Sequence, residues 1–334
     1  MKVLFIGGTG IISSACAALA VRRDIELFLL CRGTTTSRPP PREAEILRAN
    51  IDDAAEVRNR LKDLRFDAVV NWIVFEPRQI ERDLELFRGR TGQYVFISSA
   101  SAYQTPPARL PITESTPLAN PFWQYSRNKI ACEERLLRAY REEGIPITVV
   151  RPSHTYDRTT IPAPGGYSVI DRMRRGKPVI VHGDGTSLWT LTHHRDFAKG
   201  FVGLLGHDGA IGESVHITSD EVLTWNQIHE LLARAAGAEA RLVHVPSSVI
   251  AAYDADWGDG LLGDKSHSMI FDNTKIKRLV PDYRAEIPFH RGAQEIMAFY
   301  DEDAARRRVN PEFDRVVDQI VAARAAAWPQ ASIG

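Results

Sequence analysis

The chain has 334 residues, and its 42 Lys and Arg residues are balanced by 42 Asp and Glu residues, so the formal net charge is zero. Apolar residues make up 44% of the sequence and charged residues 25%, which is ordinary for a globular protein. This balance excludes a broadly basic nucleic-acid-binding protein and an acidic disordered tail. The length suggests about two domains.

The location of the protein is predicted from its cysteines and its apolar segments. Cys16, Cys31 and Cys132 are too widely spaced for a disulfide framework or a CxxC metal site, which favours a reducing cytoplasm. Residues 3–21 carry no charge and imitate a signal peptide or a membrane span. Three glycines interrupt this stretch, so we expect neither a targeting signal nor a membrane segment.

In the first half of the chain, short apolar runs alternate with amphipathic stretches. This alternation predicts strands joined by helices, and hence a parallel sheet covered by helices on both faces. The helix that ends at Gly144 is expected to have Asn120 as its N-cap. In chain order we predict a strand at 3–6, a helix at 12–22, a strand at 26–30, a polar loop at 34–42, strands at 46–47, 67–72, 94–98 and 147–151, and further helices at 54–64, 77–89 and 121–144.

After residue 151 the pattern becomes less regular. A stretch rich in Gly and Asp at 257–265 is predicted to be a loop, either on the substrate side or simply at the surface. The remaining predictions are strands at 178–181 and 214–218 and helices at 196–206, 225–236, 247–253, 289–307 and 314–327.

A glycine-rich turn at residues 7–10 follows the first strand and opens the first helix. Such a turn lets backbone N–H groups at a helix N-terminus bind a pyrophosphate. The spacing is Gly-x-x-Gly-x-x-Ser, with Ser13 in the place of the third glycine of the dinucleotide fingerprint. Because the turn lies between a strand and a helix, we interpret it as a cofactor site rather than as a plain loop. The predicted cofactor contacts are Gly7, Gly10, Ile11 and Ile12.

The residues at the end of the second predicted strand, 26–30, indicate whether the cofactor is NAD(H) or NADP(H). Sites specific for NAD usually carry an acidic residue there, which binds the ribose 2′-hydroxyl. Here Cys31 takes that place and Arg32 follows it. An arginine can pair with a 2′-phosphate, so the sequence favours NADP(H). The alternative is NAD(H) held by backbone contacts, with Arg32 simply in solvent.

Tyr125 and Lys129 lie four residues apart in one predicted helix and therefore share a face. A phenol with a pKa of about 10 is a poor proton shuttle at neutral pH. A neighbouring ammonium stabilises the phenolate and lowers that pKa. Upstream, Ser99 follows a predicted strand, at the sheet edge where α/β sites lie, and its hydroxyl can bind the reacting oxygen.

The glycine-rich turn, the Ser99 segment and the Tyr125-x-x-x-Lys129 helix together resemble the extended short-chain dehydrogenase/reductase superfamily, in its NAD-dependent epimerase/dehydratase family. The resemblance covers nearly the whole chain. It implies a Rossmann-type doubly wound parallel sheet with a smaller C-terminal α/β substrate lobe. We expect an NAD(P)-binding domain at 1–152 and a substrate-binding lobe at 153–334, with parts of 189–217 and 264–280 returning to the first domain.

The resemblance also implies roles for individual residues. Tyr125 would be the acid/base at the substrate oxygen, Lys129 would hold the nicotinamide ribose and tune Tyr125, and Ser99 would complete the catalytic set. The further cofactor contacts that the resemblance implies are Asn50, Ile51, Asn71 and Pro152, and the implied substrate contacts are Ser101, His154 and Trp189.

Two departures from the family pattern bear on the substrate. The 4,6-dehydratases of the family carry an Asp-Glu pair where this chain has Ala100 and Ser101, so an elimination of that type is disfavoured. Members that bind nucleotide sugars carry an arginine for the diphosphate where this chain has Trp189, which can stack on a ring but cannot neutralise phosphate. A nucleotide sugar would need a substitute from Arg172, Arg174 or Arg175.

These observations predict hydride transfer at a secondary alcohol or ketone of a sugar-like substrate, by an epimerase or a ketoreductase. The alternative is a non-catalytic RNA-binding or regulatory member of the same fold, similar to the chloroplast stem-loop RNA-binding proteins. The zero net charge and the retained Tyr125 and Lys129 count against that alternative, so we expect no nucleic-acid partner.

Two further expectations concern metals and oligomeric state. His193, His194 and Asp196 do not suggest a metal site, because no third ligand accompanies the histidines and Asp196 fits a helix start instead. The helices at 77–89 and 121–144 resemble the pair with which relatives form a four-helix dimer interface, so we expect a homodimer. The apolar stripe of that interface would consist of Leu84, Phe87, Leu136 and Tyr140.

Overall fold

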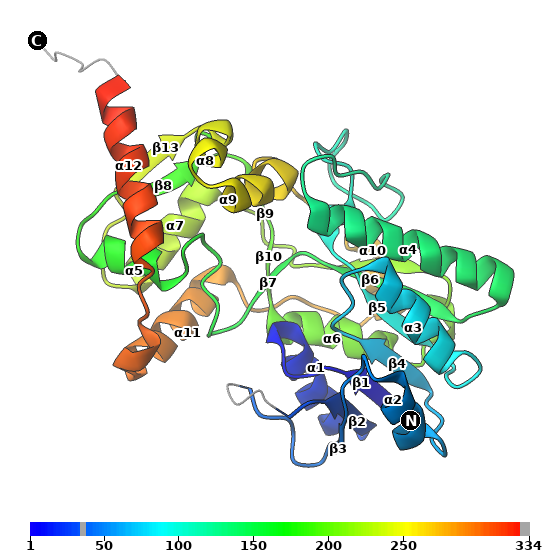
Figure 1. The fold of residues 1–334 in the computed structure, drawn as a ribbon. Helices are drawn as coiled ribbons and strands as arrows, with labels where there is room; N and C mark the ends of the chain where they lie inside the picture. Colours follow the sequence, from blue (N-terminus) through cyan, green and yellow to red (C-terminus); the bar gives the residue numbers. More distant parts are fainter. Residues whose placement is uncertain (34–37, 328–334) are drawn as a thin grey trace, which may run out of the picture.

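In the computed structural model, which describes residues 1–33 and 38–327, two lobes lie side by side (Figure 1). The larger lobe contains a seven-stranded sheet in the order β11-β6-β5-β4-β1-β2-β3, and all its neighbouring strands pair in parallel. Part of the loop predicted at 34–42 lies outside the described residues. The strands are β1 (Lys2–Ile6), β2 (Glu26–Cys31), β3 (Glu45–Arg48), β4 (Ala68–Asn71), β5 (Tyr94–Ile97), β6 (Ile147–Pro152) and β11 (Ser214–Ile217).

Helices cover both faces of this sheet, which confirms the predicted doubly wound α/β fold. Along β1, Val3 and Phe5 belong to one apolar core, whereas Leu4 and Ile6 belong to the core on the opposite face. A strand buried on both faces reads as a continuous apolar run, and this is why β1 was recognisable in the sequence. The first core lies under α1 (Ile11–Arg22), α6 (His194–Leu204) and α10 (Thr274–Leu279), and the second under α2 (Ala54–Leu61), α3 (Pro77–Phe87) and α4 (Gln124–Glu143).

The smaller lobe is built from short strand pairs and helices around a core of its own, which includes Trp189 and Trp225. Over residues 1–33 and 38–327, no helix is both long enough and apolar enough to cross a membrane. The strands are β7 (His154–Tyr156), β8 (Val179–His182), β9 (Leu188–Trp189), β10 (Leu191–His193), β12 (Leu223–Thr224) and β13 (Leu242–Val245), and the helices are α5 (Tyr167–Arg174), α7 (Trp225–Ala235), α8 (Ser247–Tyr253), α9 (Ala255–Gly260), α11 (Phe289–Glu302) and α12 (Pro311–Ala327).

The segment 257–265, predicted to be a loop, is helical, so that prediction was wrong. Helix α9 continues into a π-helical turn at Leu261–Lys265, which we call the π-turn. Glycines in both parts allow close packing. A Cβ on Gly258 of α9 would clash with Cβ of Ala251, and a Cβ on Gly263 of the π-turn would lie 2.7 Å from Cβ of Trp123. Single π-helical turns are frequent at functional sites.

The start of α4 also differs from the prediction. The helix begins at Gln124, and Asn120 lies before it rather than capping it. The Asn120 side-chain oxygen accepts hydrogen bonds from the backbone N–H groups two and three residues later, at 3.2 and 3.0 Å. Its Nδ2 donates to the carbonyl oxygens of Ser101 (2.9 Å) and Gly263 (2.6 Å). Asn120 therefore joins the segment after β5 to the π-turn.

The apolar stripe expected at a dimer interface lies mostly inside the molecule, so that detail of the prediction was wrong. The residues that look like a stripe in the sequence are the ones with which α3 and α4 pack on the sheet. Arg135 of α4 instead forms an ion pair with Glu81 of α3 (2.5 Å). The homodimer itself stays a prediction. Of the four stripe residues, Tyr140 is exposed, whereas the buried ones are Leu84, Phe87 and Leu136.

A buried ion pair attaches α4 to the sheet. The Glu133 carboxylate is fully buried and accepts hydrogen bonds from Arg151 of β6, at 3.0 Å from Nε and 2.5 Å from Nη2. The hydroxyl of Ser98, directly after β5, also donates to Glu133. Because three donors from two strands converge on one carboxylate, they determine where α4 lies along the sheet.

Replacing Glu133 with Gln should reduce the free energy of unfolding by about 3 kcal/mol, because the buried guanidinium of Arg151 loses its counter-charge. Chemical denaturation would measure this loss. The matched control is Glu134→Gln on the exposed face of the same helix, which should change stability by less than about 0.5 kcal/mol. Equal effects of the two substitutions would contradict the importance of the ion pair.

Candidate active site

The turn between β1 and α1 has the backbone of an anion cradle. Gly7 and Gly8 have φ angles of 97° and 104°, in the left-handed region that favours glycine. A Cβ on Gly8 would also lie 2.8 Å from Cδ2 of Leu29. The first N–H groups of α1, at Ile11 and Ile12, have no acceptor within the helix and are free to bind an anion. The geometry fits a dinucleotide pyrophosphate.

Ser13 occupies the position of the third glycine without disturbing this turn. It is 2% exposed, and its hydroxyl accepts a hydrogen bond from the backbone N–H of Gly10 (2.8 Å). The serine is small enough to keep α1 close to the sheet. One N–H of the turn is therefore satisfied internally, which leaves the following helical N–H groups for a ligand.

A cavity of about 450 Å³ continues from this turn along the ends of β2 and β3. Four predicted cofactor contacts line it, and Arg48, which the sequence analysis missed, lines it as well. Arg48 is opposite Cys31 in the register of β2 and β3, so only the strand pairing reveals it. The four predicted residues that line this cavity are Gly7, Arg32, Asn50 and Ile51.

Asn71, another predicted cofactor contact, is fully buried at the end of β4. Its side-chain amide donates to Asp83, and its side-chain oxygen accepts from the backbone N–H of Ile73 (3.0 Å). The Asn71 side chain thus makes its hydrogen bonds within the protein.

Tyr125 and Ser99 meet where α4 begins beside the end of β5. Burial raises the pKa of Tyr125, a hydrogen bond with Ser99 opposes that rise, and the charge of Asp264 adds to it. The expected lowering of this pKa by Lys129 was therefore wrong, because burial of the phenol dominates. The hydroxyl of Ser99 also lies 2.9 Å from the hydroxyl of Ser101, to which Ser126 donates at 2.8 Å. A connected row of hydroxyl groups therefore leads from the phenol into the interior of the protein.

Lys129 lies one helical turn beyond Tyr125 and is 2% exposed. Its ammonium donates to the carbonyl oxygens of Val74 (2.5 Å) and Ile97 (2.9 Å) and lies 5.6 Å from the centre of the Tyr125 ring. Burial lowers the pKa of Lys129 to about 8. An ammonium has three N–H donors, so one remains for a ligand hydroxyl.

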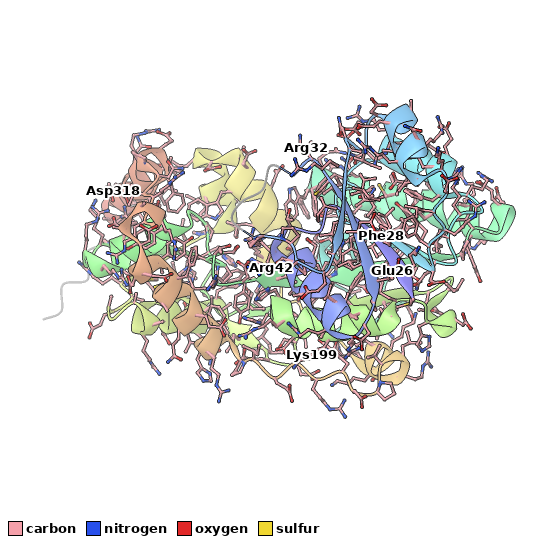
Figure 2. All side chains as sticks on the ribbon, turned by 90° about the horizontal axis from the view of Figure 1, so that it is seen from below. Glu26, Phe28, Arg32, Arg42, Lys199 and Asp318 are labelled. Carbon is pink, nitrogen blue, oxygen red and sulfur yellow. The ribbon has the colours of Figure 1, made fainter. Side chains whose placement is uncertain are left out.

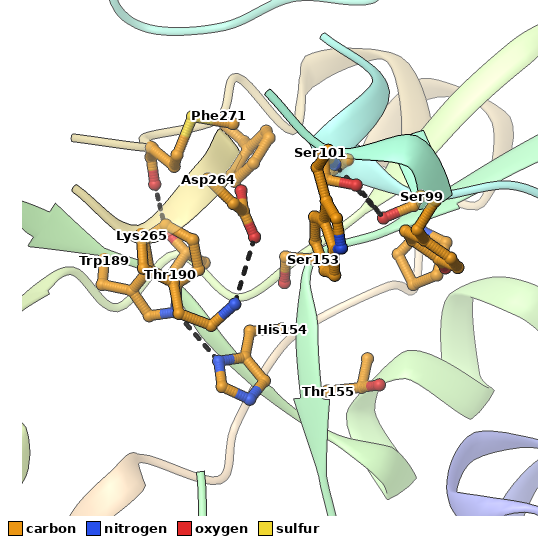
Figure 3. A pocket seen from close by; sticks show the side chains of 15 residues that line it. Ser99, Ser101, Ser153, His154, Thr155, Trp189, Thr190, Asp264, Lys265 and Phe271 are labelled. Carbon is orange, nitrogen blue, oxygen red and sulfur yellow. Dashed lines mark hydrogen bonds and ion pairs between the residues drawn. The ribbon is translucent and has the colours of Figure 1, made fainter. Parts of the chain in front are cut away.

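A second pocket, of about 340 Å³, is lined by Tyr125 and by residues of both lobes. Figure 3 shows this pocket from close by. In it the indole N–H of Trp189 donates to Nδ1 of His154 (3.1 Å), which places the His154 proton on Nε2. Burial, followed by the charge of Lys265, lowers the pKa of His154 to about 3, so this imidazole is neutral. The predicted residues that line this pocket are Ser99, Ser101, Tyr125, Pro152, His154 and Trp189.

Trp123, which the sequence analysis missed, lines the same pocket, and so do Asp264 and Lys265. These two residues belong to the segment 257–265, for which a place on the substrate side was one of the two expectations, although neither residue was singled out. Both are presented by the π-turn, and no local spacing in the sequence indicates that this turn faces the pocket. Among residues 1–33 and 38–327, no group of three or more His, Cys, Asp or Glu side chains could hold a metal ion.

The arginines considered as substitutes for a diphosphate ligand are occupied elsewhere. Arg172 is fully buried and pairs with Asp314 and Asp318 of α12, at 2.6 Å each. Arg174 pairs with Asp301 at 2.7 Å, and Arg175 also pairs with Asp314. None of the three arginines lines the substrate-side pocket.

Relatives with assigned functions share part of this chain. A 2′-dehydrokanamycin reductase of Streptomyces kanamyceticus is 28% identical over 222 residues, which cover 65% of this chain and 62% of the relative. A chloroplast stem-loop binding protein of 41 kDa from Arabidopsis thaliana is 26% identical over 262 residues, or 73% of this chain and 65% of the relative. The chain thus spans less than two thirds of the length of either relative.

Solved structures share the fold. The UDP-glucose 4-epimerase of Bifidobacterium longum, in complex with NAD⁺ and UDP, superposes with a TM-score of 0.72 at 18% identity, covering 91% of this chain and 99% of that one. The sequence profile of the NAD dependent epimerase/dehydratase family matches residues 3–218. The chain therefore belongs to the NAD-dependent epimerase/dehydratase family, as its motifs predicted.

Proposed function

We propose that the protein is an NADP(H)-dependent oxidoreductase that interconverts a secondary alcohol and a ketone on a sugar-like substrate. The observation that carries this proposal is the meeting of Ser99 and Tyr125 at one pocket, with the buried Lys129 ammonium 5.6 Å from the centre of the Tyr125 ring. The turn between β1 and α1 of the same lobe fits a dinucleotide. The bound nicotinamide would supply or accept the hydride. The chain's own residues bind the substrate oxygen and move its proton.

In the direction of reduction, the Ser99 hydroxyl donates a hydrogen bond to the substrate carbonyl oxygen, and Tyr125 transfers its phenolic proton to that oxygen. The ammonium of Lys129 stabilises the phenolate that remains, because it is held near the ring in a place with little water. Oxidation reverses these steps, with Tyr125 as the base. Ala100 and Ser101 offer no carboxylates for an elimination of water, so a 4,6-dehydratase stays disfavoured.

Changing Tyr125 to Phe should reduce turnover by at least about a hundredfold, because a positioned acid/base contributes about 10²–10⁴-fold. Loss of reduced-nicotinamide absorbance with a keto sugar measures turnover, and dinucleotide titration checks that cofactor binding is retained. Unchanged turnover would refute the catalytic role of Tyr125.

The preference for NADP(H) is supported by two arginines at the cofactor cavity. Arg32 follows β2 and Arg48 ends β3, and both side chains are exposed and line the cavity. Neither has a hydrogen-bond or ion-pair partner among residues 1–33 and 38–327. Cys31, at the place of the usual acidic residue, does not repel a phosphate. Together these features fit the 2′-phosphate of NADP(H).

Removing both guanidinium groups, with Arg32→Ala and Arg48→Ala combined, should weaken NADP⁺ binding by at least about tenfold and NAD⁺ binding by less than about threefold. Calorimetric titration of each dinucleotide measures both constants. Arg42→Ala is the matched control, because Arg42 is exposed and lies three residues before β3 in the chain but does not line the cavity. Figure 2 labels both Arg32 and Arg42. Equal losses for NAD⁺ and NADP⁺ would contradict the proposed preference.

Epimerase and reductase remain two versions of this proposal, and the fate of the cofactor distinguishes them. An epimerase regenerates its cofactor in place, so denaturing the purified protein should release tightly held NAD. A reductase exchanges its cofactor, so the protein should be purified largely without dinucleotide and should then bind NADPH. The similarity to a 2′-dehydrokanamycin reductase supports the second version.

The similarity to a chloroplast stem-loop binding protein favours one second candidate, a non-catalytic RNA-binding role. The zero net charge of the chain and the buried Lys129 beside Tyr125 favour catalysis instead. A salt-dependent gel shift with RNA at micromolar protein would support the RNA-binding role.

We also propose a division of labour between the two parts of the chain, with cofactor binding at 1–152 and substrate binding at 153–334. Helix α6, strand β11 and helix α10 return to the larger lobe, which supports the expectation that segments within 189–217 and 264–280 rejoin the cofactor domain.

We further propose a cytoplasmic homodimer. Light scattering at working concentration tests the dimer, and a monomeric mass would refute it.

A further inference from the structure

The π-turn places one carboxylate and one ammonium on the wall of the substrate pocket. Asp264 and Lys265 are adjacent, and their charged groups lie 3.6 Å apart (Figure 3). The ammonium of Lys265 also lies 5.3 Å from the ring centre of Trp123 and 5.9 Å from that of Trp189. Lys265 is therefore stabilised by its own neighbours before any ligand enters.

The charges on this pocket cancel. Among the described residues that line the pocket, Lys265 is the only lysine or arginine, and Asp264 is the only aspartate or glutamate. His154 adds no charge, because its imidazole is neutral. A diphosphate would bring its negative charges to a wall that has no surplus positive charge and already carries a carboxylate. Juxtaposition of like charges opposes binding.

The Asp264 carboxylate has acceptor capacity that the protein does not use. Within residues 1–33 and 38–327, its one partner is the Lys265 ammonium, at a distance beyond an ordinary hydrogen bond. Two carboxylate oxygens offer about four acceptor positions. Burial raises the pKa of Asp264 to about 6, so the group is still ionised at neutral pH.

The rest of the wall is aromatic or carries hydroxyl groups. Trp123, Tyr125, Trp189 and Phe271 provide flat apolar surfaces, and several Ser and Thr side chains lie between them. A ring that carries hydroxyl or amino groups presents an apolar face to such surfaces and hydrogen-bond donors at its edge. A carboxylate beside aromatic rings matches both parts of that ligand.

We propose that this pocket binds a ring that bears several hydroxyl or amino groups but no phosphate, with the Asp264 carboxylate accepting hydrogen bonds from those groups beside Trp123 and Trp189, and that it does not bind a nucleoside diphosphate. The proposal rests on the proposed oxidoreductase function and specifies its class of substrate. Lys265 compensates the charge of Asp264 and is not an anion-binding residue.

Calorimetric titration of the full chain saturated with NADP⁺ tests this inference with three probes. Kanamycin carries amino and hydroxyl groups, maltose carries hydroxyl groups alone, and UDP-glucose carries a diphosphate. Kanamycin or maltose should bind at least about tenfold more tightly than UDP-glucose, and whichever binds more tightly identifies the preferred donor groups. Tighter binding of UDP-glucose, or no binding of either phosphate-free probe, overturns the proposal.

Two variants and one control locate the interaction. Asp264→Asn should weaken binding of the preferred phosphate-free probe, kanamycin or maltose, by at least about tenfold. The matched control Asp259→Asn, at an exposed position of α9, should leave that binding unchanged. Lys265→Met should not lower the affinity for UDP-glucose, because Lys265 is not an anion-binding residue. Loss of UDP-glucose binding in Lys265→Met, or an unchanged probe affinity in Asp264→Asn, overturns the assignment.

Failure of this inference is distinguishable from failure of the proposed function. The dinucleotide titrations and the Tyr125→Phe turnover test the function without reference to Asp264. If NADP⁺ binds normally and UDP-glucose is the preferred ligand, the oxidoreductase proposal stands and the phosphate-free substrate class is wrong.

Discussion

The buried carboxylate of Glu133 is the constraint on which the rest of the candidate site depends. A charge taken out of water must be matched closely, and here Arg151 and Ser98 match it from two neighbouring strands. The same helix carries Tyr125 and Lys129 on the turns before Glu133. An interaction far from solvent therefore determines where the phenol and the ammonium lie.

The candidate site also contains a buried ammonium, that of Lys129, and burial disfavours its charged form. The lowered pKa of Lys129 means that the unfolded chain holds this proton more firmly than the folded chain. Between about pH 8 and the ordinary lysine value, the contribution of Lys129 to folding stability consequently becomes more favourable as pH rises. At neutral pH the fold gives up some stability to keep an ammonium beside the phenol, a cost typical of active sites.

Local patterns predicted much of the fold, because its main elements follow from short stretches of sequence. The apolar run of β1, the glycine turn and the four-residue spacing of Tyr125 and Lys129 each depend on close neighbours in the chain. Arg48 and Asp264 could not be found in this way, because their positions depend on strand register and on how the π-turn packs against Trp123. Leu136 was wrongly predicted to lie in an exposed dimer stripe for the same reason, because amphipathic spacing does not reveal what covers a helix face.

The side chain of Asn120 has a consequence for how the protein can change over evolution. One amide group donates both to the backbone carbonyl of Ser101, two residues after Ser99, and to the backbone carbonyl of Gly263, next to Asp264. The segment proposed to act in catalysis and the segment proposed to select the substrate are therefore mechanically coupled. New substrates would be more readily acquired by exchanging side chains on the π-turn than by altering its length, because an insertion there would also shift Ser101 and, with it, Ser99, the serine proposed to act in catalysis.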